Sequence, residues 1–100
     1  MQFIINAYDA KDALEKRMEV RPDHLENLKS AQEKGKIVCA GGKMDDSGKV
    51  IGSFLVMEFA TRDLLDKYLE SEPYIKHGVW EKVNVETCNV VIVNNEKVGK

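Results

Sequence analysis

The segment that most restricts the fold is residues 50–59, because its sequence predicts a β-strand with apolar side chains on both faces. Alternate residues of a strand point to opposite sides. One side carries Ile51, Leu55, Met57 and Phe59, and the other carries Val50, Phe54 and Val56. A sheet face in contact with water is normally polar, so both faces of this strand need a protein cover.

The elements predicted around this strand follow the order β-α-β-β-α-β. Strands are predicted at residues 2–8, within 36–44, at 50–59 and within 81–93, and helices at 22–34 and 61–70. Asp45 and Asp46 begin a turn that makes the middle two strands a hairpin, and we interpret them as turn residues and not metal ligands. This order predicts an α+β, ferredoxin-like domain with both helices on one face of a four-stranded antiparallel sheet.

Helices on one face leave the other face of the sheet open. The side chains predicted to point from the helices to the sheet are Leu25, Leu28, Ala31, Leu64, Leu65, Tyr68 and Leu69. The simplest cover for the opposite face is the same face of a second copy, so the sequence predicts a homodimer.

Composition places the chain among globular proteins and excludes several partners. Its 100 residues suit one domain, predicted at residues 1–94, followed by a polar tail at 95–100. A hydrophobic content of 43% with a net charge of −2 does not fit a disordered chain, a nucleic-acid-binding surface or a site for anionic membranes. Acids and bases alternate, as in Glu15-Lys16-Arg17, which we interpret as a solvated face.

The sequence predicts a cytoplasmic protein. The first apolar run, residues 3–7, is too short for a signal peptide, and no run approaches the roughly 20 apolar residues that span a bilayer. Cys39 and Cys88 stand apart in predicted strands, so they are expected as buried free thiols, with a disulfide between them as the less favoured alternative.

His24 is the first candidate for chemistry. Pro22 suits the first position of a helix, which would place His24 in the first turn, where the helix dipole favours a neutral imidazole with a free lone pair. The spacing of His24, Leu28 and Ala31 puts the ring on the apolar side of the helix, beside a cleft. The alternative is a histidine at the edge of the core, bonded to a backbone carbonyl.

Few other side chains could join His24. Glu72, held before Pro73, could orient the imidazole, or could be an exposed carboxylate at a helix end. Ser53 could donate to a substrate oxygen or to a neighbouring backbone group. Arg21 could bind a substrate carboxylate or lie free on the surface.

The remaining candidates are structural, and no cofactor is predicted. Tyr74 could form a wall of the pocket or simply pack, and His77 is expected to be exposed in a turn. The pair Gly41-Gly42 indicates a bend or a close approach of another group. The sequence has no P-loop, GxGxxG, HExxH or CxxC motif, so neither a nucleotide cofactor nor a metal site is predicted.

Several short motifs, taken together in order and spacing, resemble the YciI-like (YCII-related) proteins. They are Arg21-Pro22-x-His24-Leu25, Ala40-Gly41-Gly42, Gly52-Ser53, and Pro73-Tyr74 followed by Gly78-Val79, and the resemblance runs from about residue 3 to about residue 93. It implies a dimeric α/β barrel of two ferredoxin-like units and an active-site His–Asp dyad. It further implies isomerase-like or lyase-like work on small aromatic-degradation products. On this pattern His24 matches the family histidine.

The chain departs from that pattern at one position, where Glu72 stands in place of the usual aspartate. We therefore expect a small-molecule enzyme in which His24 is the base and Glu72 orients it, while Arg21, Ser53, Gly42 and Tyr74 bind a small, anionic or carbonyl-bearing substrate. The alternatives are a dimeric barrel that binds a small ligand without catalysis, and a purely structural interaction module without a cavity.

Overall fold

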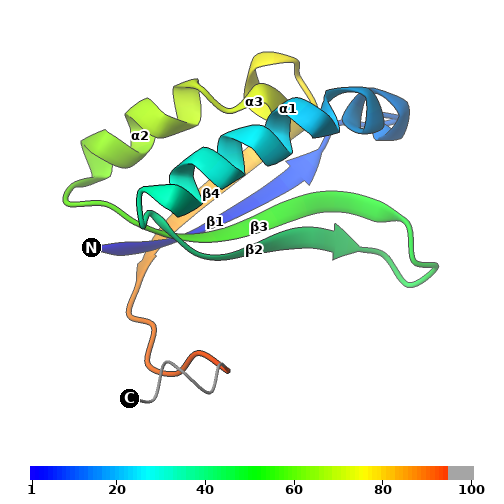
Figure 1. The fold of residues 1–100 in the computed structure, drawn as a ribbon. Helices are drawn as coiled ribbons and strands as arrows, with labels where there is room; N and C mark the ends of the chain where they lie inside the picture. The colour runs from blue at the N-terminus through cyan, green and yellow to red at the C-terminus, as the bar shows by residue number, and fades with distance from the viewer. Residues whose placement is uncertain (95–100) are drawn as a thin grey trace.

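The computed structural model describes residues 1–94 of the chain and shows a sheet with its helices on one side (Figure 1). The elements are β1 (Gln2–Asp9), α1 (Leu14–Glu33), β2 (Ile37–Met44), β3 (Val50–Glu58), α2 (Arg62–Glu70), α3 (Pro73–Lys76) and β4 (Trp80–Cys88). Every pair of neighbouring strands is antiparallel, in the order β2-β3-β1-β4. The predicted ferredoxin-like plan is confirmed. The predicted tail, residues 95–100, lies outside the described residues.

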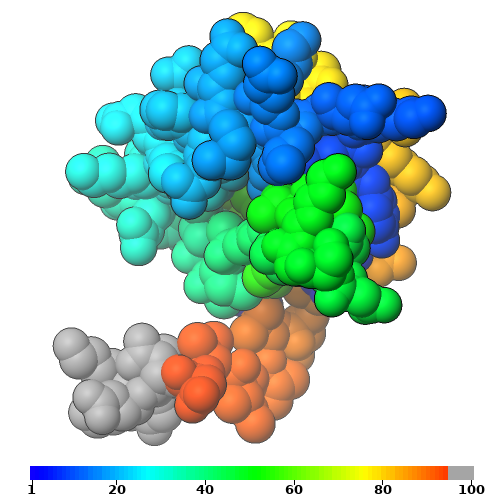
Figure 2. Space-filling model, turned by 90° about the vertical axis from the view of Figure 1, so that its right-hand side faces the viewer, coloured from blue at the N-terminus to red at the C-terminus, as the bar shows by residue number. Residues whose placement is uncertain are grey.

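The hydrophobic core fills the space between the helices and one face of the sheet. Its members include Phe3, Ile5, Ala7, Leu55, Met57, Leu65, Leu69, Tyr74 and Val79, all buried. They alternate along β1 and β3, because every second strand residue points to the helices. The opposite face has no helix over it, and residues 89–94 leave the sheet on that side (Figures 1 and 2).

The first helix begins eight residues before the predicted start. α1 runs without interruption through Pro22, so the prediction of a helix that starts at Pro22 is wrong, and His24 lies well inside the helix. An interior proline costs about 3 kcal/mol relative to alanine. Buried residues on both sides of it, Arg17 and Val20 before and Ala31 after, show that packing against the sheet outweighs this cost.

Two predicted inward leucines point elsewhere. Leu25 is 42% exposed and Leu64 is 47% exposed, whereas Leu65 and Leu69, four residues apart on α2, are buried. Adjacent helical residues differ by about 100° around the axis, so a leucine next to the buried stripe can face outward. The tyrosine of α2, Tyr68, is half-buried as it packs against the core.

Local sequence explains where α2 and α3 begin. Thr61, the first residue of the second predicted helix, is the N-cap of α2, and its side chain accepts a hydrogen bond from the Leu64 N–H at 3.2 Å. The break after α2 contains a four-residue helix, α3, with Pro73 at its first position, where a missing N–H costs nothing. β4 starts at Trp80, one residue before the predicted range, and it ends at Cys88.

The β2–β3 hairpin confirms the predicted turn and explains one glycine. The Asp45 carboxylate accepts hydrogen bonds from the backbone N–H groups of Ser47 and Lys49, both at 2.9 Å. A Cβ placed on Gly41 would lie 2.7 Å from the Phe54 ring, so the predicted close approach occurs here.

The two thiols are free, but the prediction that both are buried is wrong. Cys39 is exposed on the edge strand β2, and Cys88 is half-buried at the end of β4. A short edge strand leaves side chains open to solvent, whatever their polarity. Among residues 1–94, no helix is long and apolar enough to cross a membrane.

Candidate functional site

A cavity of about 390 Å³ lies between α1 and the β2–β3 hairpin. Its lining residues are Arg17, Met18, Arg21, His24, Leu25, Leu28, Ala40, Gly41, Gly42, Met44, Val50, Ser53, Phe54, Leu55 and Tyr74. The lining contains three basic side chains and no carboxylate. Five predicted site residues meet here: His24, Arg21, Ser53, Gly42 and Tyr74. The sixth, Glu72, lies directly behind the histidine.

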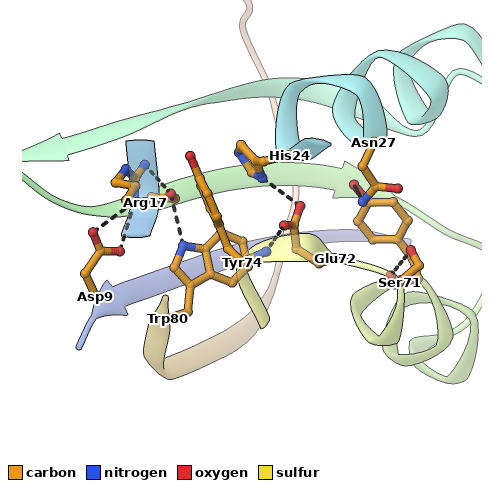
Figure 3. Close-up of polar contacts among 10 residues, drawn as sticks. Asp9, Arg17, His24, Asn27, Ser71, Glu72, Tyr74 and Trp80 are labelled. Atoms are coloured by element: carbon orange, nitrogen blue, oxygen red, sulfur yellow. Dashed lines mark hydrogen bonds and ion pairs between the residues drawn. The ribbon is translucent and has the colours of Figure 1, made fainter. Parts of the chain in front are cut away.

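The structure brings His24 and Glu72 together. The imidazole Nδ1 lies 2.8 Å from Oε1 of Glu72, as the dashed line in Figure 3 shows. Glu72 is fully buried, and its Oε2 accepts a hydrogen bond from the Tyr74 N–H at 2.7 Å. A carboxylate can only accept, so Nδ1 carries a proton, and Nε2 is the nitrogen that is left to exchange one. The extra methylene of Glu72, relative to aspartate, therefore does not prevent the contact.

The orientation of His24 does not depend on a helix start. Because α1 begins at Leu14, the positive end of its dipole lies nearly three turns before the histidine, and the predicted reason for a neutral imidazole does not apply. The ring is instead fixed by three neighbours. It bonds Glu72, stacks on Tyr74 with ring centroids 3.9 Å apart, and meets the Trp80 ring edge-on at 5.9 Å.

Arg17 is a site residue that the sequence reasoning missed. It was interpreted as part of a solvated face, but it is buried, seven residues before His24 on the same side of α1. Its Nη1 donates to both carboxylate oxygens of Asp9, at 2.9 and 3.1 Å, and its Nη2 donates to Ser53 Oγ at 2.8 Å. Extending the helix to residue 14 would have revealed this spacing.

The Asp9 carboxylate anchors that arginine. Burial raises the pKa of Asp9, and the adjacent Arg17 guanidinium partly offsets this rise by attracting and hydrogen-bonding the ionised form. Asp9 ends β1 two residues after the buried Ala7, so strand alternation points its side chain to the helices and not to the open side of the sheet.

Tyr74 lies between the two charged groups. Figure 3 shows it between Arg17 and His24, and the Arg17 Cζ is 4.7 Å from the centre of the tyrosine ring. Its hydroxyl is buried and has no hydrogen-bond partner among the described residues. Burial raises the pKa of Tyr74, so the phenol stays protonated near neutral pH.

The other predicted binding residues lie at the rim. Arg21 is exposed, one helical turn from both Arg17 and His24, and it lines the cavity. At Gly42 an added Cβ would lie 3.7 Å from the Val50 side chain, 3.9 Å from the Gly52 carbonyl oxygen and 4.0 Å from Arg17 Nη2, all ordinary contacts, so a small side chain would fit here. Across residues 1–94, no cluster of three or more His, Cys, Asp or Glu side chains could hold a metal ion.

Comparison with known proteins identifies relatives along most of the chain. The model of the YCII-related domain matches residues 1–89. Protein YciI of Escherichia coli O6:H1 (strain CFT073) is 34% identical over 92 residues, which cover 86% of this chain and 94% of that protein. An uncharacterized protein of Haemophilus influenzae is 30% identical with the same coverage.

Solved structures agree with the fold. A complex of 5-chloro-2-hydroxyhydroquinone dehydrochlorinase (TftG) from Burkholderia phenoliruptrix AC1100 with 2,5-dihydroxybenzoquinone matches with a TM-score of 0.80 and 29% identity, covering 89% of this chain and 94% of that one. An antibiotic biosynthesis monooxygenase shares the fold alone, with a TM-score of 0.55 and 13% identity over 91% and 98% of the two chains. The chain therefore has the ferredoxin-like fold of the dimeric α/β barrels and belongs to the YCII-related domain family.

Proposed function

We propose that this protein is a small-molecule enzyme in which His24 transfers a proton to or from its substrate. The observation that carries the proposal is the buried contact between Nδ1 of His24 and Glu72 beside a cavity. The carboxylate orients the ring and stabilises its protonated form, while Nε2 is the acid or base. This arrangement suits an isomerisation or an elimination, both of which begin by moving a proton.

The cavity suits an anionic or carbonyl-bearing substrate. Arg17, Arg21 and His24 are its charged or titratable lining residues, and no carboxylate lines it to repel an anion. Arg17 and Ser53 are bonded to each other and both line the cavity, so they are placed to stabilise negative charge that develops on a substrate oxygen.

The likeness to TftG suggests the chemical class of substrate. Its name describes a dehydrochlorinase of a chlorinated hydroxyhydroquinone, and it was solved with 2,5-dihydroxybenzoquinone. We therefore infer that this chain acts on a small, oxygen-substituted ring compound, either by isomerisation or by loss of a hydrogen halide. Such a compound carries the ionisable oxygens that the basic cavity would bind.

The test compares His24→Ala with His77→Ala, which changes the exposed histidine after α3. Both variants are assayed with chlorinated and unchlorinated hydroxyhydroquinones by following absorbance. We expect His24→Ala to lose turnover by at least about 100-fold, the usual contribution of a positioned acid or base, and His77→Ala to match the wild type. Equal rates in wild type and His24→Ala would rule out the mechanism, and binding without turnover would favour a ligand-binding role.

A homodimer through the open face of the sheet completes the proposal. By register, this face carries Ile4, Tyr8, Phe54 and Val56, which are half-buried or exposed. Contiguous apolar side chains on a sheet without a cover favour association. We expect the wild type to sediment as a dimer and Val56→Asp to shift it to the monomer, whereas Lys67→Asp, a charge change on the exposed side of α2, should have little effect. A monomeric wild type would contradict this part of the proposal.

The cytoplasm is the location that we propose for this activity. Cys39 and Cys88 are both free, as expected in a reducing compartment.

A further inference from the structure

The hydroxyl oxygen of Ser53 accepts two hydrogen bonds, one from a side chain of α1 and one from a side chain of β4. Arg17 Nη2 donates to its Oγ at 2.8 Å, and the indole Nε1 of Trp80 donates to the same oxygen at 3.2 Å. A serine hydroxyl has two acceptor lone pairs and one proton. Guanidinium and indole N–H groups can only donate, so both lone pairs are used and the proton must be given to another group.

The described structure contains no acceptor for that proton. Ser53 is 1% exposed and lines the cavity, yet it makes no hydrogen bond as a donor within residues 1–94. The side chains around the cavity include no carboxylate or amide, and the two other groups there that could accept, the Tyr74 hydroxyl and His24 Nε2, make no hydrogen bond with Ser53. An acceptor must therefore come from whatever enters the cavity.

We propose that Trp80 is a positioning residue that makes Ser53 a fixed hydrogen-bond donor to an oxygen atom of the bound ligand. This inference rests on the proposed function, and it adds a basis for selectivity. A hydroxyl whose lone pairs are occupied cannot accept from a ligand O–H, so the site selects an ionised or carbonyl oxygen over a protonated hydroxyl at this position.

The setting of Trp80 is suited to this task. The indole is buried at the first residue of β4, and its ring lies edge-on to Tyr74 at 5.7 Å and to His24 at 5.9 Å. Figure 3 shows its N–H directed at the hydroxyl that Arg17 also reaches. Without the N–H, one lone pair would be free, and the hydroxyl could rotate between donating and accepting.

The contact can be tested without a ligand, because Trp80 is the single tryptophan of the chain. Its indole N–H gives one resonance in a nitrogen-correlated proton spectrum. We expect Ser53→Ala to move this resonance upfield and to speed its exchange with water, since the acceptor is lost. Thr87→Ala, a change far along β4, serves as the control. An indole resonance that is unchanged by Ser53→Ala would overturn the proposal.

The effect on the ligand is measured with Trp80→Phe, which keeps a buried ring but removes the N–H. The probe is 2,5-dihydroxybenzoquinone, titrated by calorimetry at a pH at which it is ionised. We expect its affinity to fall about tenfold, the loss of roughly one hydrogen bond. In the Ser53→Ala background the same change should cost less than about twofold, because the hydroxyl is already absent.

A structural role for Trp80 gives a different result. If the ring acted only by packing, Trp80→Phe would weaken binding equally in both backgrounds, and this outcome would overturn the proposal. Selectivity gives a second measurement, because Trp80→Phe should narrow the preference for the ionised probe over its protonated form. If the wild type failed to bind the probe, the ligand class proposed above would be wrong, and the indole resonance would still decide whether Trp80 holds Ser53.

Discussion

Two buried ion pairs lie on either side of the Tyr74 ring, and they differ in what they can do. Arg17 is joined to Asp9 at 2.9 Å, and His24 is joined to Glu72 at 2.8 Å. Arginine stays protonated at every pH of biological interest, so the first pair has one charge state. The imidazole of the second pair is charged only when it is protonated, so that pair has two possible charge states.

The acids of the two pairs are held in correspondingly different ways. Both oxygens of Asp9 accept from the same guanidinium nitrogen, so the carboxylate serves to fix Arg17. Glu72 gives only one oxygen to His24, and the other is held by the Tyr74 backbone N–H. The comparison teaches that a buried acid at a similar distance can be held either by one cation that is always charged or between an imidazole and a backbone N–H.

The largest effect should come from removing the fixed charge. Arg17→Met leaves Asp9 buried without its partner, so we expect a loss of about 3–5 kcal/mol in the free energy of unfolding, measured by urea denaturation. The matched control is Arg62→Met, which breaks the half-exposed pair with Asp66 and should cost less than about 0.5 kcal/mol. Similar losses in both variants would mean that burial does not distinguish the two pairs.

A smaller effect is expected from Glu72→Gln. The carboxylate accepts from both His24 and Tyr74, but an amide offers one oxygen and one NH₂ group, so one of the two contacts becomes a donor facing a donor. We expect a loss of about 1–3 kcal/mol in the free energy of unfolding, with turnover reduced about 100-fold.

The control for this change is Glu72→Asp. It keeps the negative charge and introduces aspartate, the residue that the resemblance to the YCII-related proteins leads us to expect at this position. It should retain more turnover than Glu72→Gln. If the amide variant kept full turnover, the charge of Glu72 would have no part in the chemistry, and the contrast between the two ion pairs would disappear.

The smallest effect concerns the pH dependence of Asp9. Burial raises its folded pKa above 3.8, so the folded chain holds this proton more tightly than the unfolded chain does. The contribution to stability is therefore fully present below pH 3.8 and is lost as the pH rises through the raised pKa. The free energy of unfolding of the wild type minus that of Asp9→Asn should fall with pH over this window.

Asp23→Asn, an exposed change on α1, serves as the control and should show no such slope. A wild-type advantage that grew with pH would mean that attraction by Arg17 outweighs burial. The measurement therefore tests whether burial or the attraction of Arg17 has the larger effect on the pKa of Asp9.

Much of the fold could be predicted because it follows from local patterns. Alternating apolar residues marked the strands, Thr61 marked the start of α2, and the turn after β2 was evident from its Asp and Gly residues. The start of α1 could not be placed in this way. An interior proline looks like a helix start, and only the packing of Arg17 and Val20 reveals that the helix is already formed.

The candidate site was predictable in part. His24 and Glu72 were chosen by residue type, by position beside a proline and by resemblance to a family, and the structure brings them together. Arg17 was missed because its sequence neighbours are charged and exposed, so the local pattern indicated a solvated surface. Trp80 was missed because it lies just before the range predicted for the last strand, and no local pattern indicates which group its N–H would reach.

The sequence by itself determined the order and type of the elements, since strand alternation, capping and turn chemistry act between residues close in the chain. Only the tertiary structure decided which polar side chains meet at the cavity and behind its wall. Asp9, Arg17, Ser53 and Trp80 come from four separate elements, and their contacts depend on the register of β1 with β4 and on the rotation of α1 over the sheet. Those are set by packing across the whole core, which no local stretch of sequence specifies.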